Sequence, residues 1–377
     1  MTAFTAGRLR AQRLIGKPLS SPLEVVRWLG AVQAQDFAGA KWAVAQRSRA
    51  ATDAALDRLF DRGAILRTHV MRPTWHFVAP EDVRWLLELT APRVRRGLAS
   101  RYRELEIDDS VAARAGAAFA AELAGGRHLT RPELGRALSG AGISPEGQRL
   151  PHLLLRAELD QLIVSGPRRG KEFTYALLEE RAPKVPAMDR SEALTELTLR
   201  YFRSHGPAQV QDFTWWSGLT AGDARRGITL AGASLEHRVV EGKDYWSDAA
   251  ADGASNEAVV AHLLPNFDEY TVGYRDRSAL MPTAGRFDPS LFSFGSILSN
   301  VVTVDGVVRG GWRRSSVRST TLIEVRLFEK LTESETAAVA DAGRRMSRFL
   351  GRPVSYAVAV GGAAPPPEKG IQGSGNL

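Results

Sequence analysis

The sequence predicts an α+β protein in which tandem winged-helix modules precede a small C-terminal β-barrel domain. Three features lead to this expectation: capped helical segments up to about residue 235, a helix–helix–hairpin order between His128 and Leu178, and closely spaced strand-like runs afterwards. A chain of 377 residues is long enough for two or three domains. We expect modules at residues 1–100, 101–185 and 186–235, a barrel with a closing helix at 236–360, and a flexible tail at 361–377.

The first module is expected to combine short helices with an extended segment. Ser20, Ser21 and Pro22 supply a cap and a first-turn proline for a helix. The segment Ile65–Val78 is rich in β-branched and aromatic residues, which predicts an extended wing. Helices are expected over Leu23–Leu29, Ala54–Leu59, Glu81–Glu88 and, opening the next module, Val111–Leu123.

The second module has the clearest winged-helix order. Thr130 followed by Glu133 is a capping-box pattern that predicts a helix start. A second helix is expected over Leu150–Leu159, and two strands, Leu162–Ser165 and Phe173–Ala176, flank a basic loop. In a winged helix, one helix enters a DNA groove and the loop of the hairpin contacts phosphates. Arg168, Arg169 and Lys171 in this loop are therefore candidate DNA contacts, although many such modules bind protein instead.

The third module and the C-terminal region follow a different pattern. Helices are expected over Ser191–Arg203 and Val210–Ser217, with Leu219–Asp223 capping the next one. The dipeptide Asp305-Gly306 between apolar runs predicts a hairpin. Thr332–Phe349 has an acidic start and a basic end, as the helix dipole favours. Strand-like runs that would form the barrel are Asp244–Trp246, Val259–Leu264, Asn300–Val304, Val307–Trp312 and Thr320–Leu327.

Composition narrows the classes of function. The formal net charge of +8 favours a polyanionic partner, and nucleic acid is the commonest one, although GC-rich coding also produces arginine-rich proteins. The absence of cysteine excludes disulfides, iron–sulfur clusters and thiolate nucleophiles. No signal-peptide core and no stretch of about 18 uncharged apolar residues is present. We therefore expect a soluble, cytoplasmic protein. We also expect a monomer.

Short motifs of several enzyme classes are missing. The sequence has no P-loop, no Gly-x-Gly-x-x-Gly and no Gly-x-Ser-x-Gly. The seven histidines are scattered without a His-x-x-x-His pair, so no metal site is expected. What remains is Gln33-Ala34-Gln35-Asp36, where an extended backbone would project Gln33 and Gln35 to one side. Two neutral amides can orient a water or a base edge, but a polar surface turn explains the same residues.

Four segments together resemble the AlkZ/YcaQ-like winged-helix DNA glycosylases. The segment Ala31–Asp36 is similar to the Gln-x-Gln motif of that family, with Gln35 as in the AlkZ branch where the YcaQ branch has Asp. The other three occur in the family's order: Met71–Val78, with Pro73 where glycine is often found, Leu264–Arg277, and Val307–Arg313. The resemblance covers nearly the whole chain up to about Val360.

This resemblance implies tandem winged helices in a C shape and a C-terminal β-barrel. It also implies a monofunctional DNA glycosylase that releases alkylated purines of the N7-alkylguanine type by hydrolysis, with no metal or cofactor and with Gln33 and Gln35 as catalytic residues. The substrate would be double-stranded DNA with alkylated bases, in DNA repair or in resistance to a genotoxin, with bulky adducts and interstrand crosslinks left open. Lys41 lies near the motif, but nothing around it suggests a Schiff base.

Several further residues are candidates for the site. On a strand, Arg72, Thr74 and His76 would share one face and either border the lesion pocket or form a buried polar support. Asp268 and Tyr270 are expected to belong to a buried polar network that supports the fold. Trp312, Arg313 and Arg314 combine a stacking ring with charge, so they either contact DNA or include a tryptophan of the barrel core.

Two other classes of function remain open from the sequence. A non-catalytic regulator would use the winged helices alone, but it would have no need for two amides in a cleft. An RNA-binding protein has little support, because no aromatic-basic RNA motif is visible.

Overall fold

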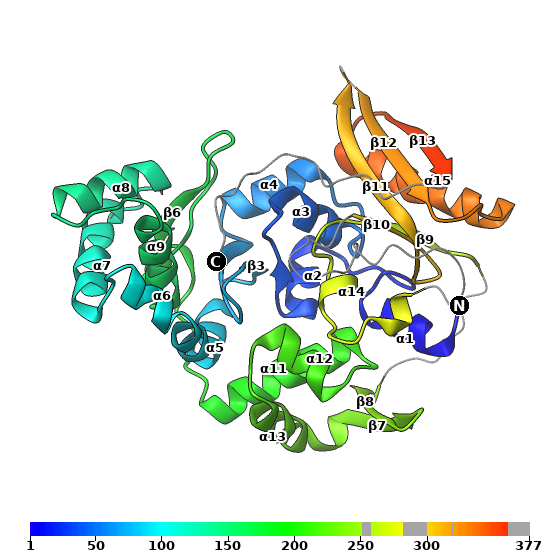
Figure 1. The fold of residues 1–377 in the computed structure, drawn as a ribbon, viewed down its shortest axis with the longest axis horizontal. Helices are drawn as coiled ribbons and strands as arrows, with labels where there is room; N and C mark the ends of the chain where they lie inside the picture. The colour runs from blue at the N-terminus through cyan, green and yellow to red at the C-terminus, as the bar shows by residue number, and fades with distance from the viewer. Residues whose placement is uncertain (251–257, 282–299, 318–319, 361–377) are drawn as a thin grey trace. The chain divides into compact units, whose positions relative to one another are not determined.

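The computed structural model describes residues 1–250, 258–281, 300–317 and 320–360 and divides into two compact units. Unit 1 combines Met1–Pro22, Asp36–Ala54 and the chain from Ala251 onward, and unit 2 combines Leu23–Gln35 with Ala55–Ala250. Figure 1 shows the elements of both units in chain colours. The expected tail at 361–377 lies outside the described residues. The five-part domain division and the C shape stay predictions.

Unit 1 is built around a five-stranded sheet of order β13-β12-β11-β10-β9. All pairs are antiparallel except β12 with β13, which are parallel. Its elements are α1 (Ala3–Ala11), α3 (Phe37–Ala45), β9 (Ala261–Leu264), α14 (Glu269–Val272), η2 (Ser278–Leu280), β10 (Val301–Val304), β11 (Val307–Val317), β12 (Thr320–Leu327), α15 (Glu333–Leu350) and β13 (Val354–Val360).

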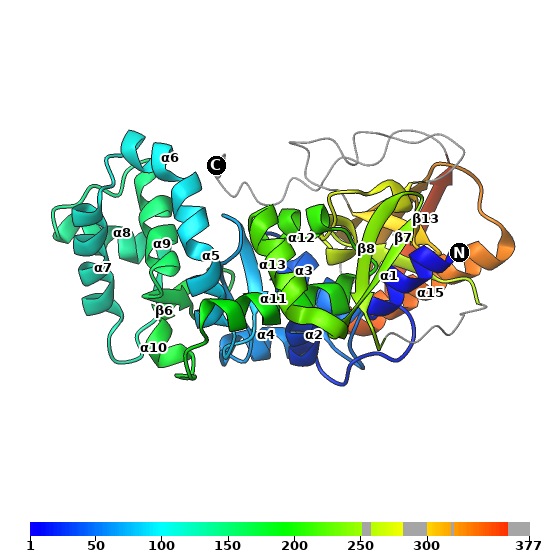
Figure 2. The same cartoon turned by 90° about the horizontal axis from the view of Figure 1, so that it is seen from below.

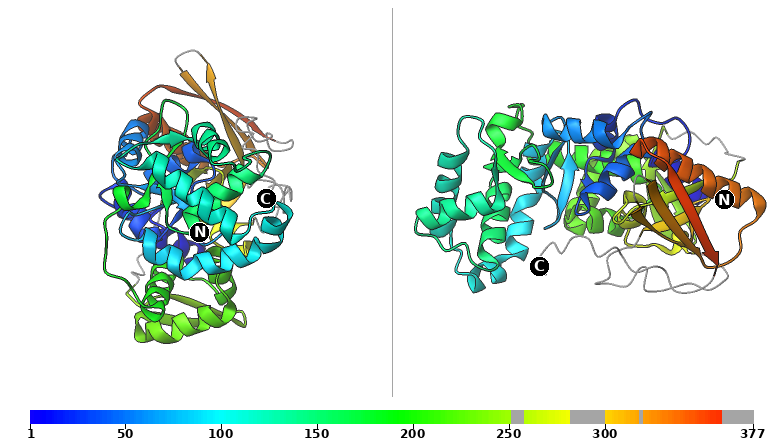
Figure 3. Two further views of the ribbon diagram at one scale, coloured as in Figure 1. Left: turned by 90° about the vertical axis from the view of Figure 1, so that its left-hand side faces the viewer. Right: turned by 90° about the horizontal axis from the view of Figure 1, so that it is seen from above.

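The expected β-barrel is wrong, because this sheet is open. Within the described residues, β9 and β13 are its two edges and do not pair with each other. The helix α15 contacts β9, β10 and β13 and runs beside the strands in Figures 1 and 3. A helix with an apolar stripe buries the apolar face of a sheet, so the sheet need not close on itself. The hairpin at Asp305-Gly306 is confirmed: both residues have positive φ, 49° and 78°, as a type I′ turn requires.

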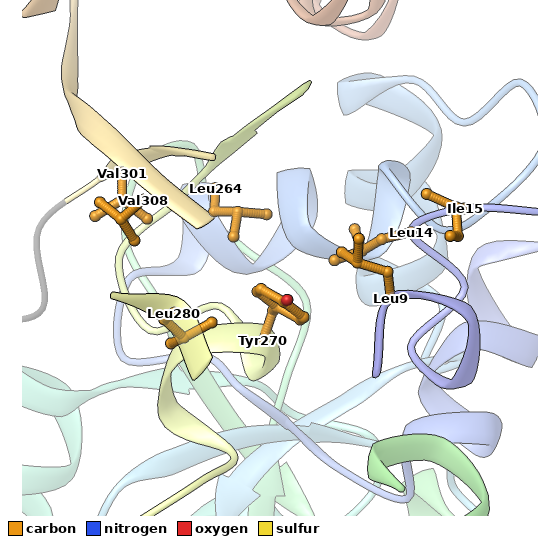
Figure 4. Close-up of a cluster of buried hydrophobic side chains, with 8 residues drawn as sticks. All are labelled: Leu9, Leu14, Ile15, Leu264, Tyr270, Leu280, Val301 and Val308. Carbon is orange, nitrogen blue, oxygen red and sulfur yellow. The ribbon is translucent and has the colours of Figure 1, made fainter. Parts of the chain in front are cut away.

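The core of unit 1 joins its first residues to its sheet. Leu9 and Leu14, from the N-terminal segment, are buried in one cluster with Leu264, Tyr270 and Val308 (Figure 4). The rest of that cluster is Ile15, Leu280 and Val301. Burying apolar side chains is the main favourable term in folding, so the N-terminal segment is an integral part of this unit.

Unit 2 is mainly helical and carries three small sheets of order β1-β3-β2, β4-β6-β5 and β7-β8. Its helices are α2 (Pro22–Leu29), α4 (Asp53–Asp61), α5 (Val83–Gly97), α6 (Ala99–Glu104), α7 (Asp109–Leu123), α8 (Arg131–Gly140), α9 (Arg149–Leu159), α10 (Leu178–Arg181), α11 (Arg190–His205), α12 (Val210–Ser217), α13 (Ala221–Ala231) and η1 (Gly232–Ser234). Its strands are β1 (Val32–Gln33), β2 (Leu66–His69), β3 (Trp75–Val78), β4 (Leu129–Thr130), β5 (Ile163–Ser165), β6 (Thr174–Leu177), β7 (Leu235–Val240) and β8 (Lys243–Asp248).

The helix–helix–hairpin order expected between His128 and Leu178 is present. A capping box at Thr130 and Glu133 starts α8, and the backbone N–H of Thr130 donates to the Glu133 carboxylate at 2.7 Å. The helix α9 and the β5–β6 hairpin follow, and β4 pairs with β6. Figure 2 shows α7, α8 and α9 grouped together in this part of unit 2. That the other modules repeat this arrangement stays a prediction.

The sequence predicted that the run Asp244–Trp246 would be a strand of the C-terminal barrel, and this prediction is wrong. The run lies in β8, which pairs only with β7 among the described strands. Ala208 and Trp246 form an isolated bridge, and Arg203 pairs with Asp248 at 3.2 Å. The hairpin is thereby bound to α11 and the turn after it. None of the described helices is long and apolar enough to cross a membrane.

Candidate active site

Gln33 and Gln35 do not lie on one continuous strand. Strand β1 ends at Gln33, and Gln35 is in a bend before α3. The expected extended geometry is therefore correct for Gln33 and wrong for Gln35. The bend forms because Asp36 caps α3, accepting the backbone N–H of Gly39 at 3.0 Å. Gln33 is buried, with 6% of its surface exposed, whereas Gln35 is exposed.

The two amides have different surroundings. The Oε1 atom of Gln33 accepts a hydrogen bond from Nη2 of Arg72 at 3.0 Å. This bond to a charged donor fixes which end of the Gln33 amide faces Arg72. The side chain of Gln35 makes no hydrogen bond to any residue that the structure describes. Gln35 therefore has both its donor and its acceptor available to a ligand or a water.

Arg72, Thr74 and His76 do not share the face of one strand, so that prediction is wrong. Arg72 and Thr74 lie in bends before β3, and only His76 is in the strand. The strand cannot start earlier because Met71 has φ 65°, and the N–H of Thr74 donates to Arg72 at 2.7 Å in a tight turn. The turn still brings Arg72 to Gln33. His76 is buried opposite Gln33 in the sheet register, and its Nδ1 lies 2.8 Å from the Thr74 carbonyl.

The backbone between the two glutamines is held on both sides. The N–H of Ala34 donates to the carbonyl of Trp75 at 2.7 Å. The carbonyl of Ala34 accepts a hydrogen bond from Nε of Arg67, on β2, at 3.0 Å. Sequence reasoning missed Arg67, which belongs to no motif. Its position on a buried strand was the only available signal, because a buried arginine needs a partner.

The Arg67 guanidinium lies between two aromatic rings. Its central carbon is 4.3 Å from the ring centre of Trp75 and 4.6 Å from that of Phe173. Burial lowers the pKa of Arg67 to about 10, which still leaves it charged at neutral pH. His69, two residues along β2, contacts the carboxylate of Glu158 on α9, and both are buried. Strand β2 thus carries the buried polar side chains of Arg67 and His69, and the contact of His69 with Glu158 joins β2 to α9.

The basic loop of the β5–β6 hairpin is partly committed to contacts within unit 2. Arg169 pairs with Glu133 at 2.7 Å, and the hydrogen bonds of Glu133 with Thr130 and Arg169 lower the pKa of this carboxyl to about 2. Arg168 lies 3.9 Å from Asp57 and over the ring of Phe173. Lys171 is exposed at the tip. Lys171 is therefore the loop cation most available to a phosphate.

The three C-terminal candidates belong to unit 1 and have different environments. Trp312 is buried, and its indole N–H donates to the Leu264 carbonyl at 2.8 Å. This placement favours the alternative of a core tryptophan over base stacking. Arg313 forms a salt bridge with Glu324 across β11 and β12. Arg314 lines a small hollow together with Asp36 and Asn300.

Asp268 and Tyr270 form a buried support within unit 1. The carboxylate of Asp268 accepts two hydrogen bonds from Arg47, at 2.7 and 2.9 Å, and neither side chain is exposed. Asp268 also caps α14, and the hydroxyl of Tyr270 donates to the Gly306 carbonyl at 3.2 Å. These contacts tie the end of α3 to α14 and to the β10–β11 turn. Both residues therefore act as support in this unit.

Lys41 is buried on α3 and bonds Asp53 at 2.7 Å. This ion pair engages the amine, which counts against Lys41 as a Schiff-base nucleophile. Among the described residues, no cluster of three or more His, Asp or Glu side chains has a metal-binding arrangement.

Comparison with known proteins identifies relatives over nearly the whole chain. A family model described as DNA glycosylase AlkZ-like matches residues 26–349. An interstrand DNA cross-link repair glycosylase from Streptomyces sahachiroi is 27% identical over 368 residues, which is 89% of this chain and 95% of the relative. The solved structure of Streptomyces sahachiroi DNA glycosylase AlkZ is similar in fold, with a TM-score of 0.76 at 23% identity, covering 94% of this chain and 98% of that chain.

Proposed function

Since this chain belongs to the AlkZ-like family of DNA glycosylases, we propose that it hydrolyses the N-glycosidic bond of alkylated purines in duplex DNA. The bond broken joins C1′ of the sugar to N9 of the base. A water molecule supplies the oxygen that joins C1′ and gives up one proton to the solvent, and the base leaves with the bonding electron pair. The products are the free alkylated base and an abasic site. The preferred lesions are purines alkylated at N7, above all guanine.

The chemistry of this lesion matches a site made of neutral amides. Alkylation at N7 makes the purine cationic, so it departs as a neutral base and needs no strong general acid. The enzyme has to hold a water near C1′ and stabilise the developing positive charge on the sugar. An amide is a weak base but orients water well, since it offers a donor and an acceptor.

The observation that carries this proposal is the contrast between the two glutamines. Gln35 is exposed, and its amide has no partner among the described residues, whereas Gln33 is buried and bound by Arg72. We assign Gln35 to the water and Gln33 to the neighbouring wall of the site. The Ala34 backbone, bonded by Trp75 and Arg67, keeps the two residues in a fixed relation.

Crosslinks are the more demanding substrate. The Streptomyces sahachiroi relative is named for the repair of interstrand DNA crosslinks. We extend this substrate class to the present chain, with a bulky N7 adduct or an N7–N7 crosslink released one base at a time. Asp268, Tyr270 and Trp312 support this reaction by keeping unit 1 folded, and Arg168, Arg169 and Lys171 by contacting phosphates.

The decisive experiment measures base release directly. A duplex oligonucleotide with one N7-methylguanine is incubated with excess enzyme, and free base is quantified by mass spectrometry beside an undamaged duplex. A nitrogen-mustard crosslinked duplex is followed in parallel on a denaturing gel. Release of the methylated base supports the proposal. Duplex binding without any base release would favour the non-catalytic regulator.

The same reaction distinguishes hydrolysis from strand cleavage. A monofunctional enzyme leaves an intact abasic strand that breaks only on alkaline treatment. A Schiff-base enzyme would be trapped on DNA by borohydride and would cleave the strand without alkali. We expect no trapping, in line with the ion pair between Lys41 and Asp53.

A further inference from the structure

One charged side chain reaches the catalytic motif without belonging to it. Arg67 bonds the carbonyl of Ala34, the residue between Gln33 and Gln35, at 3.0 Å. That oxygen belongs to the same planar peptide unit as the N–H of Gln35. Because the peptide unit is rigid, fixing its oxygen fixes the direction in which the chain enters Gln35.

We propose that Arg67 is a positioning residue that sets the orientation of Gln35 through the Ala34 peptide. This inference rests on the proposed function of the glutamines. Gln35 depends on such a contact because β1 ends at Gln33, so Gln35 itself has no strand partner in the described part of the chain. Its side chain also has no partner among the described residues, so its placement depends on its backbone.

Arg67 is itself held rigidly. Its own N–H donates to Oγ of Ser165 on β5 at 2.8 Å, and its strand pairs with β3. The rings of Trp75 and Phe173 lie 4.3 and 4.6 Å from its guanidinium, which restricts rotation of the side chain. Phe173 and Ser165 flank the basic loop. Arg67 therefore links the position of Gln35 to the second sheet, which carries the proposed DNA contact.

The chemistry of this position requires arginine. The guanidinium is planar, stacks on aromatic rings and directs its Nε–H in its own plane. Lysine keeps the charge, but its ammonium sits at the end of a flexible chain and lacks both the plane and a donor at the Nε position. Exchange of Arg67 for lysine should loosen the bend without removing the buried charge.

The expected effect is on rate. Displacement of a catalytic group by about 1 Å can cost about 100-fold. We expect Arg67→Lys to slow single-turnover base release by about 10- to 100-fold. The affinity for undamaged duplex should stay within about twofold, because Arg67 contacts the main chain of the protein and not a DNA phosphate.

The matched control is Arg181→Lys. Arg181 also donates to backbone carbonyls in unit 2, those of Ser165, Phe60 and Asp61, but does not touch the motif. Both lysine variants are made in the wild-type and in the Gln35→Ala background. If Arg67 acts through Gln35, Arg67→Lys slows the wild-type enzyme but changes the Gln35→Ala enzyme by less than about twofold. The inference would be overturned if Arg67→Lys slowed base release by the same factor in both backgrounds. It would also be overturned if Arg181→Lys slowed base release as much as Arg67→Lys does.

A second measurement does not depend on activity. Hydrogen exchange followed by mass spectrometry on the peptide around residues 31–36 should be faster in Arg67→Lys than in wild-type and unchanged in Arg181→Lys. Unchanged exchange in Arg67→Lys refutes the role of Arg67, whatever the activity. Absence of base release by the wild-type enzyme refutes the proposed function instead, so the two failures are distinguishable.

Discussion

Replacement of Gln35 by alanine should separate catalysis from stability. The side chain is exposed and makes no hydrogen bond to the described residues, so its loss should change the free energy of unfolding by at most about 0.5 kcal/mol. Loss of one oriented donor or acceptor in the transition state typically costs about 100-fold or more in rate. One hundredfold corresponds to about 2.7 kcal/mol of transition-state stabilisation.

Gln33→Ala is the informative comparison. Gln33 is buried, and its removal takes an acceptor from Arg72, so the folded state should lose about 1–3 kcal/mol in addition to the loss in rate. The double variant should lose less rate than the product of the single losses, because both residues serve one reaction centre.

The assay is single-turnover release of N7-methylguanine with enzyme in saturating excess. Denaturant unfolding of each variant is measured in parallel, and fluorescence anisotropy gives the affinity for undamaged duplex. Near-wild-type release by Gln35→Ala would refute the assignment of Gln35 to the water. A destabilised Gln35→Ala variant would show that its slow rate reflects damaged structure.

Three further predictions concern the surface and the interior. Lys171→Ala should weaken duplex binding and reduce the slope of log affinity against log salt concentration by about 1. Arg169→Ala should have a smaller effect, because Arg169 is already paired with Glu133. Affinity is measured by anisotropy over a salt series, and identical slopes for the wild-type and both variants would exclude this loop from the DNA interface. Burial lowers the pKa of His262 to about 4, below its value near 6.5 in the unfolded chain. The contribution of neutral His262 to the free energy of unfolding is therefore complete above about pH 6.5 and is lost as the pH falls towards 4. Denaturation of wild-type and His262→Gln between pH 7 and 4 should show about 3 kcal/mol more acid destabilisation in the wild-type, and parallel curves would contradict this. Asp268→Asn should lower the free energy of unfolding by about 3–5 kcal/mol, because it leaves the buried Arg47 charge uncompensated. Base release per folded molecule should stay normal. An unchanged denaturation midpoint would count against a supporting role for Asp268.

Local signals in the sequence predicted local structure well. The capping box at Thr130 starts a helix, and Asp305-Gly306 forms the expected hairpin. The segment Val210–Ser217 is a helix with the expected bounds, and Thr320–Leu327 is a strand with the expected bounds. The capping box and the hairpin turn succeed because the residues involved bond the backbone within three or four positions of themselves.

Long-range pairing was beyond the reach of the sequence. The strand-like runs suggested a barrel, but sheet closure depends on which edges meet, and α15 covers the sheet instead. The parallel strand β13 was not expected at all. Gln35 was placed on a strand because alternation alone does not reveal that Asp36 caps a helix. Arg67 was missed because its contact with Ala34 spans 33 positions.

The assembly of unit 1 from three separated stretches has a consequence for biosynthesis. Leu9 and Leu14 pack with Leu264 and Val308, which leave the ribosome about 250 to 300 residues later. Most of unit 2, Ala55–Ala250, is continuous and can fold while synthesis proceeds. The segment that carries Leu9 and Leu14 therefore lacks its packing partners until the strands of the five-stranded sheet emerge. A chain halted near residue 250 would therefore display these leucines and be a ready client for chaperones and proteases.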